Sequence, residues 1–402
     1  MTNADIASFL SAKILYMRDL NTCRLAIDEI DGKLLDLLSQ RKDVAADIAE
    51  CKLQKDQKIS DPAREQEKLD AIMEKARALN LPPAFAAAVF KTVIANTVSY
   101  EQEYAINRLH HQKIKRSTSV AYLGPKGTYS HLAAMRYLSM YTDHIKERDC
   151  RAFDEIVASV ESGKSEYGLL PIENSSSGSI NGVLDVLQDS KVSLVGEIFV
   201  PIDHAVLTCA KVNVGEITDI YSHPQPIEQC SRWLKDFMPK VNIHYMKSTS
   251  HAMEEVQKLN DPHCAAIASH HAGSYYGLLP IMDNIANNVH NYTRFVAISM
   301  IPLLLPESID AKTSISFTVA KYTPGSLICV LNEFSKLGIN LTKLTSRPRL
   351  SPGHDTWEEI FFADVQGNLS SPQMQNCLEK IRSYTGSLKI LGCYASDERK
   401  RK

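Results

Sequence analysis

The chain has 402 residues, of which 44% are hydrophobic and 23% are charged, and its formal net charge is −2. A near-neutral balance provides no basic surface that would attract a polyanion. The composition therefore argues against a nucleic-acid-binding protein. The length predicts two to three domains, because single hydrophobic cores stop growing at a few hundred residues. The apolar runs are too short to cross a bilayer, and the first residues lack the pattern of a signal peptide, so we expect a cytoplasmic protein.

The cysteine and histidine patterns give no indication of a metal centre. Nine cysteines are scattered without a CxxC pair, which is typical of reduced thiols rather than of a disulfide framework or a zinc site. The pair His110-His111 has no further ligands at metal spacing, so we interpret it as solvated chain. We therefore expect no metal and no cofactor.

Residues 18–108 are predicted to form an all-helical domain that follows an N-terminal extension, residues 1–17. Apolar residues recur at helical spacing from about residue 22 past residue 52. Asp61-Pro62 predicts the start of a second helix, with the aspartate as N-cap and the proline in the first turn, and a third helix follows. The first helix is too long to bury its apolar stripe within a three-helix monomer, so we expect an intertwined dimer.

A change of pattern after the helices predicts further domains. Residues 109–118 are polar and basic and are interpreted as a linker. In residues 119–300 short β runs alternate with helices, which is typical of an α/β domain. The sequence YGLLPI occurs twice there, at 167–172 and 276–281, each time as a buried-strand pattern before a polar loop. The repeat favours a two-lobed domain in which both lobes contribute to a shared cleft.

The last segment, residues 312–396, repeats the mixed pattern on a smaller scale. A strand at 313–320 is followed by a helix from Gly325 to Leu337 and by two further strands. A helix from Pro372 to Tyr384 and a final strand complete the order βαββαβ. This order predicts a ferredoxin-like arrangement.

Charged residues on the first predicted helix form a stripe. Arg41, Ala45, Ile48 and Lys52 lie at i, i+4, i+7 and i+11, which places them on a single face. The two cations are then about 16 Å apart along the axis and can hold a small dianion between them. Arg24 lies about 25 Å from Arg41 and roughly 100° around the helix, so it cannot serve the same pocket within one subunit. In a dimer of antiparallel long helices it could serve the partner's pocket. From spacing alone, a solvated charged face is the favoured alternative.

The spacing of Arg24, Arg41, Lys52 and Asp61-x-x-Arg64-Glu65 resembles, without gaps, the signature of AroQ-type chorismate mutases. The resemblance implies an entwined dimer of three helices per subunit that converts chorismate to prephenate. It implies that the cations bind the substrate carboxylates and ether oxygen, that Glu65 holds the hydroxyl group and that Asp61 supports it. The residues implied for chorismate binding are Arg24, Arg41, Lys52, Asp61, Arg64, Glu65, Thr97 and Glu101.

The implied rearrangement is pericyclic and needs no nucleophile, base or metal. Catalysis requires a compact substrate conformer and positive charge where the breaking C–O bond gathers negative charge, and we expect Lys52 at that oxygen. Glu101 stands where many bacterial members have glutamine. Because a carboxyl group donates a hydrogen bond only when protonated, we hypothesise that the mutase favours acidic pH. The alternative is a one-residue slip that makes Gln102 the donor, although Gln102 lies ~100° off the face.

Several motifs between residues 120 and 300 resemble those of prephenate dehydratases. The matching segments follow predicted strands or start helices: Gly124–Gly127, Pro171–Gly178, Ser222–Gln225, Ser248–Ser250 and Asn291–Phe295. The family's ENxSSG and Thr-Arg-Phe elements, within the second and the last of these, are the specific ones. The resemblance implies a two-lobed, periplasmic-binding-protein-like α/β fold. The missing GxGxxG argues against a fusion with an NAD-linked prephenate dehydrogenase.

The implied dehydratase reaction expels CO2 and hydroxide together as the ring becomes aromatic, so a catalyst must help the hydroxide to leave. The family gives this role to the threonine of Thr-Arg-Phe, here Thr293, either as a proton donor or as a polarised hydrogen-bond donor. Arg294 has two equally open interpretations, which are binding of a substrate carboxylate and structural pairing. His223 is interpreted equally as a turn residue or as a catalyst. The residues implied for prephenate binding are Glu173, Asn174, Ser175, Ser176, Gln229, Thr293 and Arg294.

Residues 312–396 resemble an ACT domain of the dehydratase type. The family's phenylalanine-binding elements match two short segments, so the implied allosteric residues are Gly325, Ser326, Leu327, Ser346 and Arg347. Thr345 replaces a family glutamate, so the strength and selectivity of inhibition stay open.

The three resemblances occur in the order found in bifunctional P-proteins of phenylalanine biosynthesis. They imply an enzyme that acts on chorismate and prephenate, is inhibited by phenylalanine, and forms a homodimer or a higher oligomer. The alternative is an amino-acid-sensing binding protein in which one or both active sites are silent.

Overall fold

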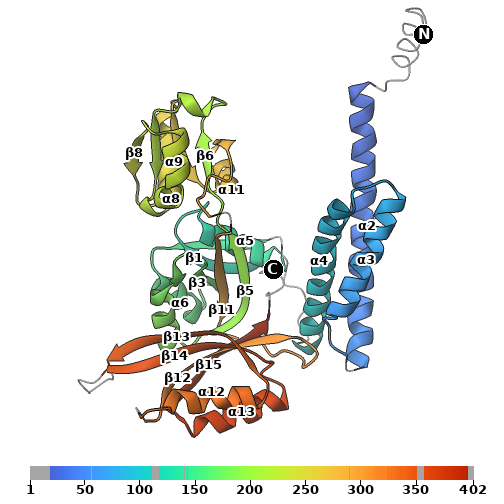
Figure 1. Cartoon of the computed structure of the whole chain (residues 1–402), viewed down its shortest axis with the longest axis vertical. Coiled ribbons are helices and arrows are strands. Elements are labelled where there is room, and N and C mark those ends of the chain that lie inside the picture. Colours follow the sequence, from blue (N-terminus) through green and yellow to red (C-terminus); the bar gives the residue numbers. More distant parts are fainter. Residues whose placement is uncertain are drawn as a thin grey trace, which may run out of the picture. The chain divides into compact units, whose positions relative to one another are not determined.

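The structure is a computed structural model. It describes residues 19–55, 57–110, 117–139, 141–142, 144–288, 290–321, 323–350 and 357–396. The predicted N-terminal extension and residues 111–116 of the predicted linker lie outside the described residues. The chain separates into two compact units, Met1–Ala105 and Ile106–Lys402 (Figure 1). No helix of the described residues is both long and apolar enough to cross a membrane.

The described part of the first unit is helical, as the sequence predicts. Its helices are α2 (Leu20–Gln54), α3 (Pro62–Ala78) and α4 (Pro83–His110). The predicted start of α3 is confirmed in detail, because the Asp61 carboxylate accepts a hydrogen bond from the Arg64 backbone N–H and a proline occupies the first turn. This cap fixes the end of α3 that carries Arg64 and Glu65.

The apolar stripe of α2 is largely exposed in the single chain. Only Ala45 and Ala49 are buried on this helix of 35 residues, which is about 52 Å long at ~1.5 Å per residue. Leu25, Leu34 and Leu37 remain 69%, 52% and 59% exposed. An apolar stripe of this length is typical of a surface that a partner covers. It supports the expected dimer, which stays a prediction.

A ten-stranded mixed sheet runs through the second unit in the order β13-β14-β12-β15-β5-β11-β3-β1-β2, and β4 pairs with β3. Its first part comprises β1 (Thr118–Leu123), β2 (Ile145–Cys150), β3 (Tyr167–Asn174), β4 (Gly178–Ser179), β5 (Ser193–Pro201) and β11 (Tyr292–Ser299). β1 pairs in parallel with β2 and β3, whereas β11 lies antiparallel between β3 and β5. The helices α5 (Tyr129–Leu138), α6 (Phe153–Glu161) and α7 (Asn181–Asp189) pack on these strands. This part is the first lobe.

A second, five-stranded sheet forms the other lobe in the order β10-β6-β9-β7-β8 (Figure 1). Its strands are β6 (Ala205–Thr208), β7 (Asp219–Ser222), β8 (Asn242–Tyr245), β9 (Cys264–Ala268) and β10 (Leu279–Met282). The described helices of this lobe are α8 (Pro224–Gln229), α9 (Ser231–Phe237), α10 (Thr249–Leu259) and α11 (His270–Gly273), with 3-10 turns η1 (Val214–Glu216) and η2 (Ser274–Tyr276).

The repeated YGLLPI sequence does not fold the same way twice. Its first copy begins β3, which is buried within the large sheet, as predicted. Its second copy starts at the end of η2, turns at Gly277 with φ +66°, and continues into the exposed edge strand β10. The expectation of two buried strands is therefore wrong for the second copy, because β10 lies at the end of its sheet and pairs there with β6. The two-lobed arrangement itself is confirmed.

The C-terminal domain has the predicted order βαββαβ. Its elements are β12 (Ala311–Val319), α12 (Ser326–Lys336), β13 (Asn340–Leu350), β14 (Trp357–Gln366), α13 (Pro372–Arg382) and β15 (Thr385–Ala395). The strands pair antiparallel, and both helices pack on one face of them over a core that includes Phe317, Phe334 and Met374. The ferredoxin-like arrangement is thus confirmed.

The C-terminal strands continue the sheet of the first lobe. β15 runs beside β5, with Gly392 opposite Leu194. A Cβ atom at Gly392 would lie 2.2 Å from the Leu194 carbonyl oxygen, so this close approach requires glycine. Ile360 and Leu391 also share one buried cluster with Leu184 of α7. The two parts are therefore packed as one body.

Candidate functional site

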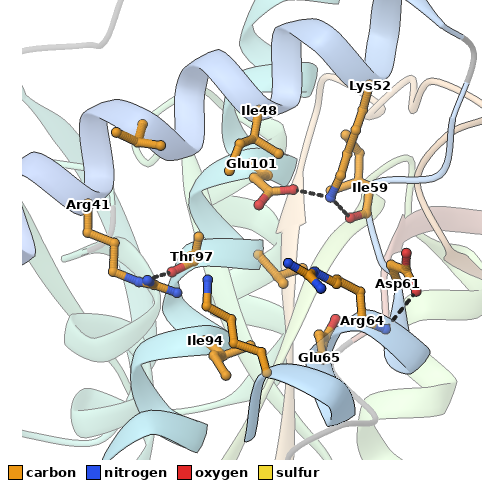
Figure 2. Close-up of a pocket in the computed structure, with 13 residues that line it drawn as sticks. Arg41, Ile48, Lys52, Ile59, Asp61, Arg64, Glu65, Ile94, Thr97 and Glu101 are labelled. Atoms are coloured by element: carbon orange, nitrogen blue, oxygen red, sulfur yellow. Dashed lines mark hydrogen bonds and ion pairs between the residues drawn. The ribbon is translucent and has the colours of Figure 1, made fainter. Parts of the chain in front are cut away.

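A pocket of about 340 Å³ opens between α2, α3 and α4 (Figure 2). It contains every residue predicted for chorismate binding except Arg24, which lies exposed elsewhere on α2. Its lining is a ring of charged groups over apolar side chains: Arg41, Val44, Ile48, Lys52, Ile59, Asp61, Arg64, Glu65, Lys68, Ile94, Thr97, Val98 and Glu101.

Lys52 is held at one end of the pocket by two oxygen acceptors. Its Nζ donates to the Glu101 carboxylate at 2.6 Å and to the Ile59 carbonyl at 2.5 Å (Figure 2). Glu101 comes from α4 and is only 4% exposed. Gln102 is not part of the described pocket lining. Of the two proposed donors, the geometry therefore favours Glu101, which points at the same space as Lys52.

Three further cations border the pocket. The Arg41 Nε donates to the Thr97 hydroxyl at 2.9 Å, and Arg64 pairs with Glu67 at 2.6 Å while 67% of its side chain stays exposed. Lys68 was missed by the sequence analysis, although it follows Arg64 at the i+4 spacing that places both on one helix face. Burial lowers the pKa of Lys68, and the charges of Arg41 and Arg64 lower it further. A bound dianion would oppose that repulsion.

In the second unit, Thr293 lies where β11 starts beside the end of β3. The Asn174 side-chain amide donates to the Thr293 Oγ1 and to the Asn291 Oδ1, both at 2.9 Å. The Asn174 Oδ1 accepts from the backbone N–H groups of Ser176 and Ser177 at 2.9 Å and 3.0 Å. Since the Thr293 oxygen accepts this bond, its own O–H hydrogen remains able to donate.

The same loop is tied to the start of β11 through Ser175. Its hydroxyl donates to the His290 carbonyl at 3.2 Å and accepts from the Tyr292 N–H at 2.9 Å. The register between β11 and β3 shifts between Arg294 and Phe295. Bulges of this kind re-aim side chains and occur next to active sites.

Arg294 is 4% exposed and lies in a buried polar cluster. Its guanidinium donates to Glu197 at 2.8 Å, to Asp364 at 2.6 Å and to the Tyr394 hydroxyl at 2.8 Å. Burial opposes its charge, but the neighbouring oxygen groups hold the pKa of Arg294 well above its ordinary value. Of the two interpretations of Arg294, these contacts support structural pairing.

Glu173 links this cluster to the loop. Its carboxylate lies 3.6 Å from the Arg294 Nη1 and 3.3 Å from the Lys343 Nζ, and a quarter of the side chain is exposed. Lys343 comes from β13 and only 11% of its side chain is exposed. Burial lowers the pKa of Lys343, which the Glu173 charge partly offsets. No local motif marks Lys343, so the sequence analysis missed it.

Gln229 and His223 lie on the second lobe. The Gln229 Oε1 is 2.7 Å from His204 Nε2, and His204 Nδ1 is 3.3 Å from the Tyr129 hydroxyl. This pairing joins Gln229 to α5 of the first lobe. His223 is the N-cap of α8, where its Nδ1 accepts from the Gln225 N–H. That contact supports the turn interpretation of His223.

The residues predicted for phenylalanine lie at two places in the C-terminal domain. Gly325, with φ +87°, precedes α12, whose first residues are Ser326 and Leu327. Ser346 and Arg347 lie on β13, and Arg347 binds Asp185 of α7 through two bonds of 3.1 Å and 2.7 Å. Arg347 thus bridges the C-terminal domain and the first lobe in this structure.

Comparisons with known proteins show the family of the chain. Residues 23–102 match the family chorismate mutase type II, and residues 120–301 match the family prephenate dehydratase. The chain is 39% identical over 371 residues to the bifunctional chorismate mutase/prephenate dehydratase of Enterobacter agglomerans, covering 92% of this chain and 94% of that one. It is 36% identical over 375 residues to the protein of that name from Escherichia coli K12, covering 93% and 95%.

A solved structure gives the fold of the second unit. The prephenate dehydratase of Arthrobacter aurescens, in complex with L-Phe, superposes with a TM-score of 0.62 at 24% identity. It covers 70% of this chain and 91% of that one. At this identity the likeness shows a common fold. Within the described residues, no group of three or more potential metal ligands is present.

Proposed function

The chain belongs to the family of bifunctional chorismate mutase/prephenate dehydratases, and we propose which of its residues perform the two reactions. The enzyme rearranges chorismate to prephenate and converts prephenate to phenylpyruvate in phenylalanine biosynthesis. We assign the mutase to residues 18–108, the dehydratase to residues 119–300 and regulation to residues 312–396, in a cytoplasmic enzyme. The observation that carries the mutase assignment is the pocket in which Arg41, Lys52 and Arg64 converge.

In the mutase, Arg41, Arg64 and Lys68 bind the chorismate carboxylates, and Lys52 donates to the ether oxygen. The Ile59 carbonyl and one side-chain oxygen of Glu101 hold the Lys52 ammonium in place before the substrate arrives, so little reorganisation is needed as charge develops on that oxygen. Glu65 accepts a hydrogen bond from the substrate hydroxyl, and the Asp61 cap fixes the end of α3 that carries Glu65. The pocket walls favour the compact conformer.

In the dehydratase, the Thr293 hydroxyl donates to the leaving hydroxyl group of prephenate. The Asn174 amide donates to the Thr293 oxygen, so the threonine hydrogen is available to donate to the substrate. One ring carbon loses its carboxylate as CO2, and the electron pair of that bond makes the ring aromatic as the C–O bond at the opposite ring carbon breaks. The departing hydroxide takes up a proton, which comes from solvent through the hydrogen bond of the Thr293 hydroxyl, and leaves as water. Glu173, Ser175, Ser176 and the second-lobe residue Gln229 border the cleft that holds the ring.

Regulation is assigned to the C-terminal domain, with L-phenylalanine as effector bound by Gly325, Ser326, Leu327, Ser346 and Arg347. The structure of a relative in complex with L-Phe supports L-phenylalanine as the effector. The test is to give the purified chain chorismate, with and without phenylalanine, and to record chorismate loss and phenylpyruvate formation. Phenylpyruvate that is suppressed by phenylalanine is the expected result. Binding of phenylalanine without any turnover would instead indicate an amino-acid sensor.

Arg24 is proposed to complete the mutase pocket of a partner subunit. The variants Arg24→Ala and Lys52→Met should each be nearly inactive as mutases. After unfolding and refolding as an equimolar mixture, we expect about one quarter of wild-type activity, because half of the dimers then contain one intact site out of two. If the mutase rate of the refolded mixture does not exceed the average rate of the two separate variants, Arg24 does not act in the partner's pocket. It then either acts in the pocket of its own subunit or takes no part in the mutase reaction.

Glu101 is proposed to donate to the substrate only in its protonated form. Because deprotonation removes this donor, we expect mutase kcat/KM to fall by about tenfold or more from pH 5 to pH 8. Glu101→Gln should give a flat profile, and Gln102→Ala should keep the wild-type one. A flat wild-type profile, or a profile that only Gln102→Ala changes, would contradict this role.

A further inference from the structure

His204 lies in the segment, residues 202–204, that leads from the first lobe of the dehydratase to the second. Pro201 at the end of β5 pairs with Tyr292, the neighbour of Thr293 on β11. Since three residues span at most ~11 Å, His204 is close to the end of β11 that carries Thr293. The backbone N–H of Ile285, in the segment that returns to the first lobe, donates to the His204 carbonyl at 3.2 Å. The backbone of His204 is therefore fixed beside the junction of the two lobes.

The His204 ring contacts both lobes through its nitrogen atoms, and only 1% of the residue is exposed. Its Nε2 lies 2.7 Å from the Gln229 Oε1 of the second lobe, and its Nδ1 lies 3.3 Å from the Tyr129 hydroxyl of the first lobe. Because an amide oxygen can only accept a hydrogen bond, the His204 Nε2 carries a hydrogen and donates it to Gln229. Burial lowers the pKa of His204, which favours a neutral ring whose one hydrogen is on Nε2.

This bond fixes the orientation of the Gln229 side-chain amide. With the amide oxygen on the imidazole, the amide nitrogen and its two N–H groups face away from His204. The Asn287 backbone N–H donates to the Gln229 carbonyl at 2.7 Å, which fixes the backbone of Gln229 as well. Within the described residues, the Gln229 Nε2 has no hydrogen-bond partner, and it stays accessible. Gln229 therefore presents two donors that these protein groups leave unused.

Two N–H donors suit a carboxylate of prephenate, which has one carboxylate on the ring and one on its three-carbon side chain. The ring carboxylate leaves as CO2 and has to give up its negative charge, so a donor there would stabilise the substrate more than the transition state. The side-chain carboxylate keeps its charge throughout the reaction. A donor to this second carboxylate strengthens the binding of substrate, transition state and product alike.

We propose that His204 is a positioning residue of the dehydratase, which holds the Gln229 amide so that its N–H groups donate to the side-chain carboxylate of prephenate. Without the donor on His204, the amide is free to turn and to place its oxygen against that anion. The contact contributes to substrate affinity and leaves the dehydration step at Thr293 unchanged. This inference rests on the proposed role of Gln229 in prephenate binding.

The test compares His204→Met with His204→Gln in the full chain. Both side chains have the same length and remove the imidazole from Tyr129, but only glutamine has an N–H group to donate to Gln229. For His204→Met, we expect KM for prephenate to rise by about tenfold or more, because a hydrogen bond to a charged group is lost, with kcat within about threefold of wild type. The inhibition constant of the product phenylpyruvate, which keeps the side-chain carboxylate, should rise by the same factor. His204→Gln should keep both constants within about threefold of wild type.

A double-variant cycle with Gln229→Ala shows whether His204 acts through Gln229. Gln229→Ala should raise KM by a similar factor, and the double variant His204→Met/Gln229→Ala should be no worse than Gln229→Ala alone. Additive losses, or equal losses in His204→Met and His204→Gln, would assign the effect to packing and overturn the positioning role. A loss of kcat without a change in KM would contradict it as well.

Two further outcomes separate this inference from the proposed function. Wild-type KM in His204→Met, with KM raised in Gln229→Ala, overturns the positioning role and leaves the assignment of Gln229 intact. Wild-type KM in Gln229→Ala overturns the assignment on which the inference rests. If His204→Met does not fold, His204→Phe decides by the same criteria, because phenylalanine keeps a ring of similar shape without a nitrogen.

Discussion

Replacing Thr293 with valine is expected to lower kcat for prephenate dehydration by about a hundredfold or more, the size of effect that loss of a positioned proton donor produces. Valine has nearly the same shape but no hydroxyl, so the departing hydroxide loses its donor. The Asn174 amide keeps its bond to Asn291, so the loop keeps most of its local structure and the stability cost should be about 1 kcal/mol. Formation of phenylpyruvate from prephenate measures the effect.

The control for this prediction is Thr293→Ser. Serine keeps the hydroxyl group at the same position and should retain dehydratase activity within about tenfold of wild type, since only the methyl group that restricts χ1 is lost. The mutase activity of each variant reports on folding of the chain outside the dehydratase. Equal dehydratase rates for the serine and valine variants would show that the hydroxyl does not take part in the chemistry.

Local sequence patterns predicted the parts of the fold that local physics decides. Asp61 and Pro62 predict the start of α3 because an N-cap acceptor and a fixed φ act within one turn. The βαββαβ order follows in the same way from the alternation of periods along the chain. The second YGLLPI copy shows what a local pattern does not predict. Burial of such a segment depends on its place in the sheet, and β10 is an exposed edge strand.

The same distinction between local and long-range determinants applies to the residues of the candidate sites. Arg41, Lys52 and Glu101 could be predicted because helical spacing and a family signature place them on facing surfaces, and the structure brings them to one pocket. Asp364 and Lys343 could not, because their contacts with Arg294 and Glu173 join strands that are far apart in the sequence and depend on sheet order and register.

Replacing Lys52 with methionine is expected to reduce mutase kcat/KM by about a hundredfold to a thousandfold, the range seen when one preorganised charge donor to a developing anion is removed. Methionine fills a similar volume but supplies no charge to the ether oxygen. It also leaves the Glu101 carboxylate, only 4% exposed, beside an incoming dianion, so substrate binding should weaken as well. Chorismate loss measures the effect, and the dehydratase activity of the same chain is the folding control.

The double variant Lys52→Met/Glu101→Gln separates these two contributions. Because glutamine carries no charge and can donate to the ether oxygen, the double variant should exceed Lys52→Met in kcat/KM, with recovery in both kcat and KM. Recovery confined to KM would assign Glu101 an electrostatic role, whereas recovery of kcat would identify the residue-101 side chain as a second donor. If the kcat/KM of the single variant Lys52→Met stays within about threefold of wild type, Lys52 does not make the contact with the ether oxygen. Lys68 is then the next cation in the pocket to test for this role.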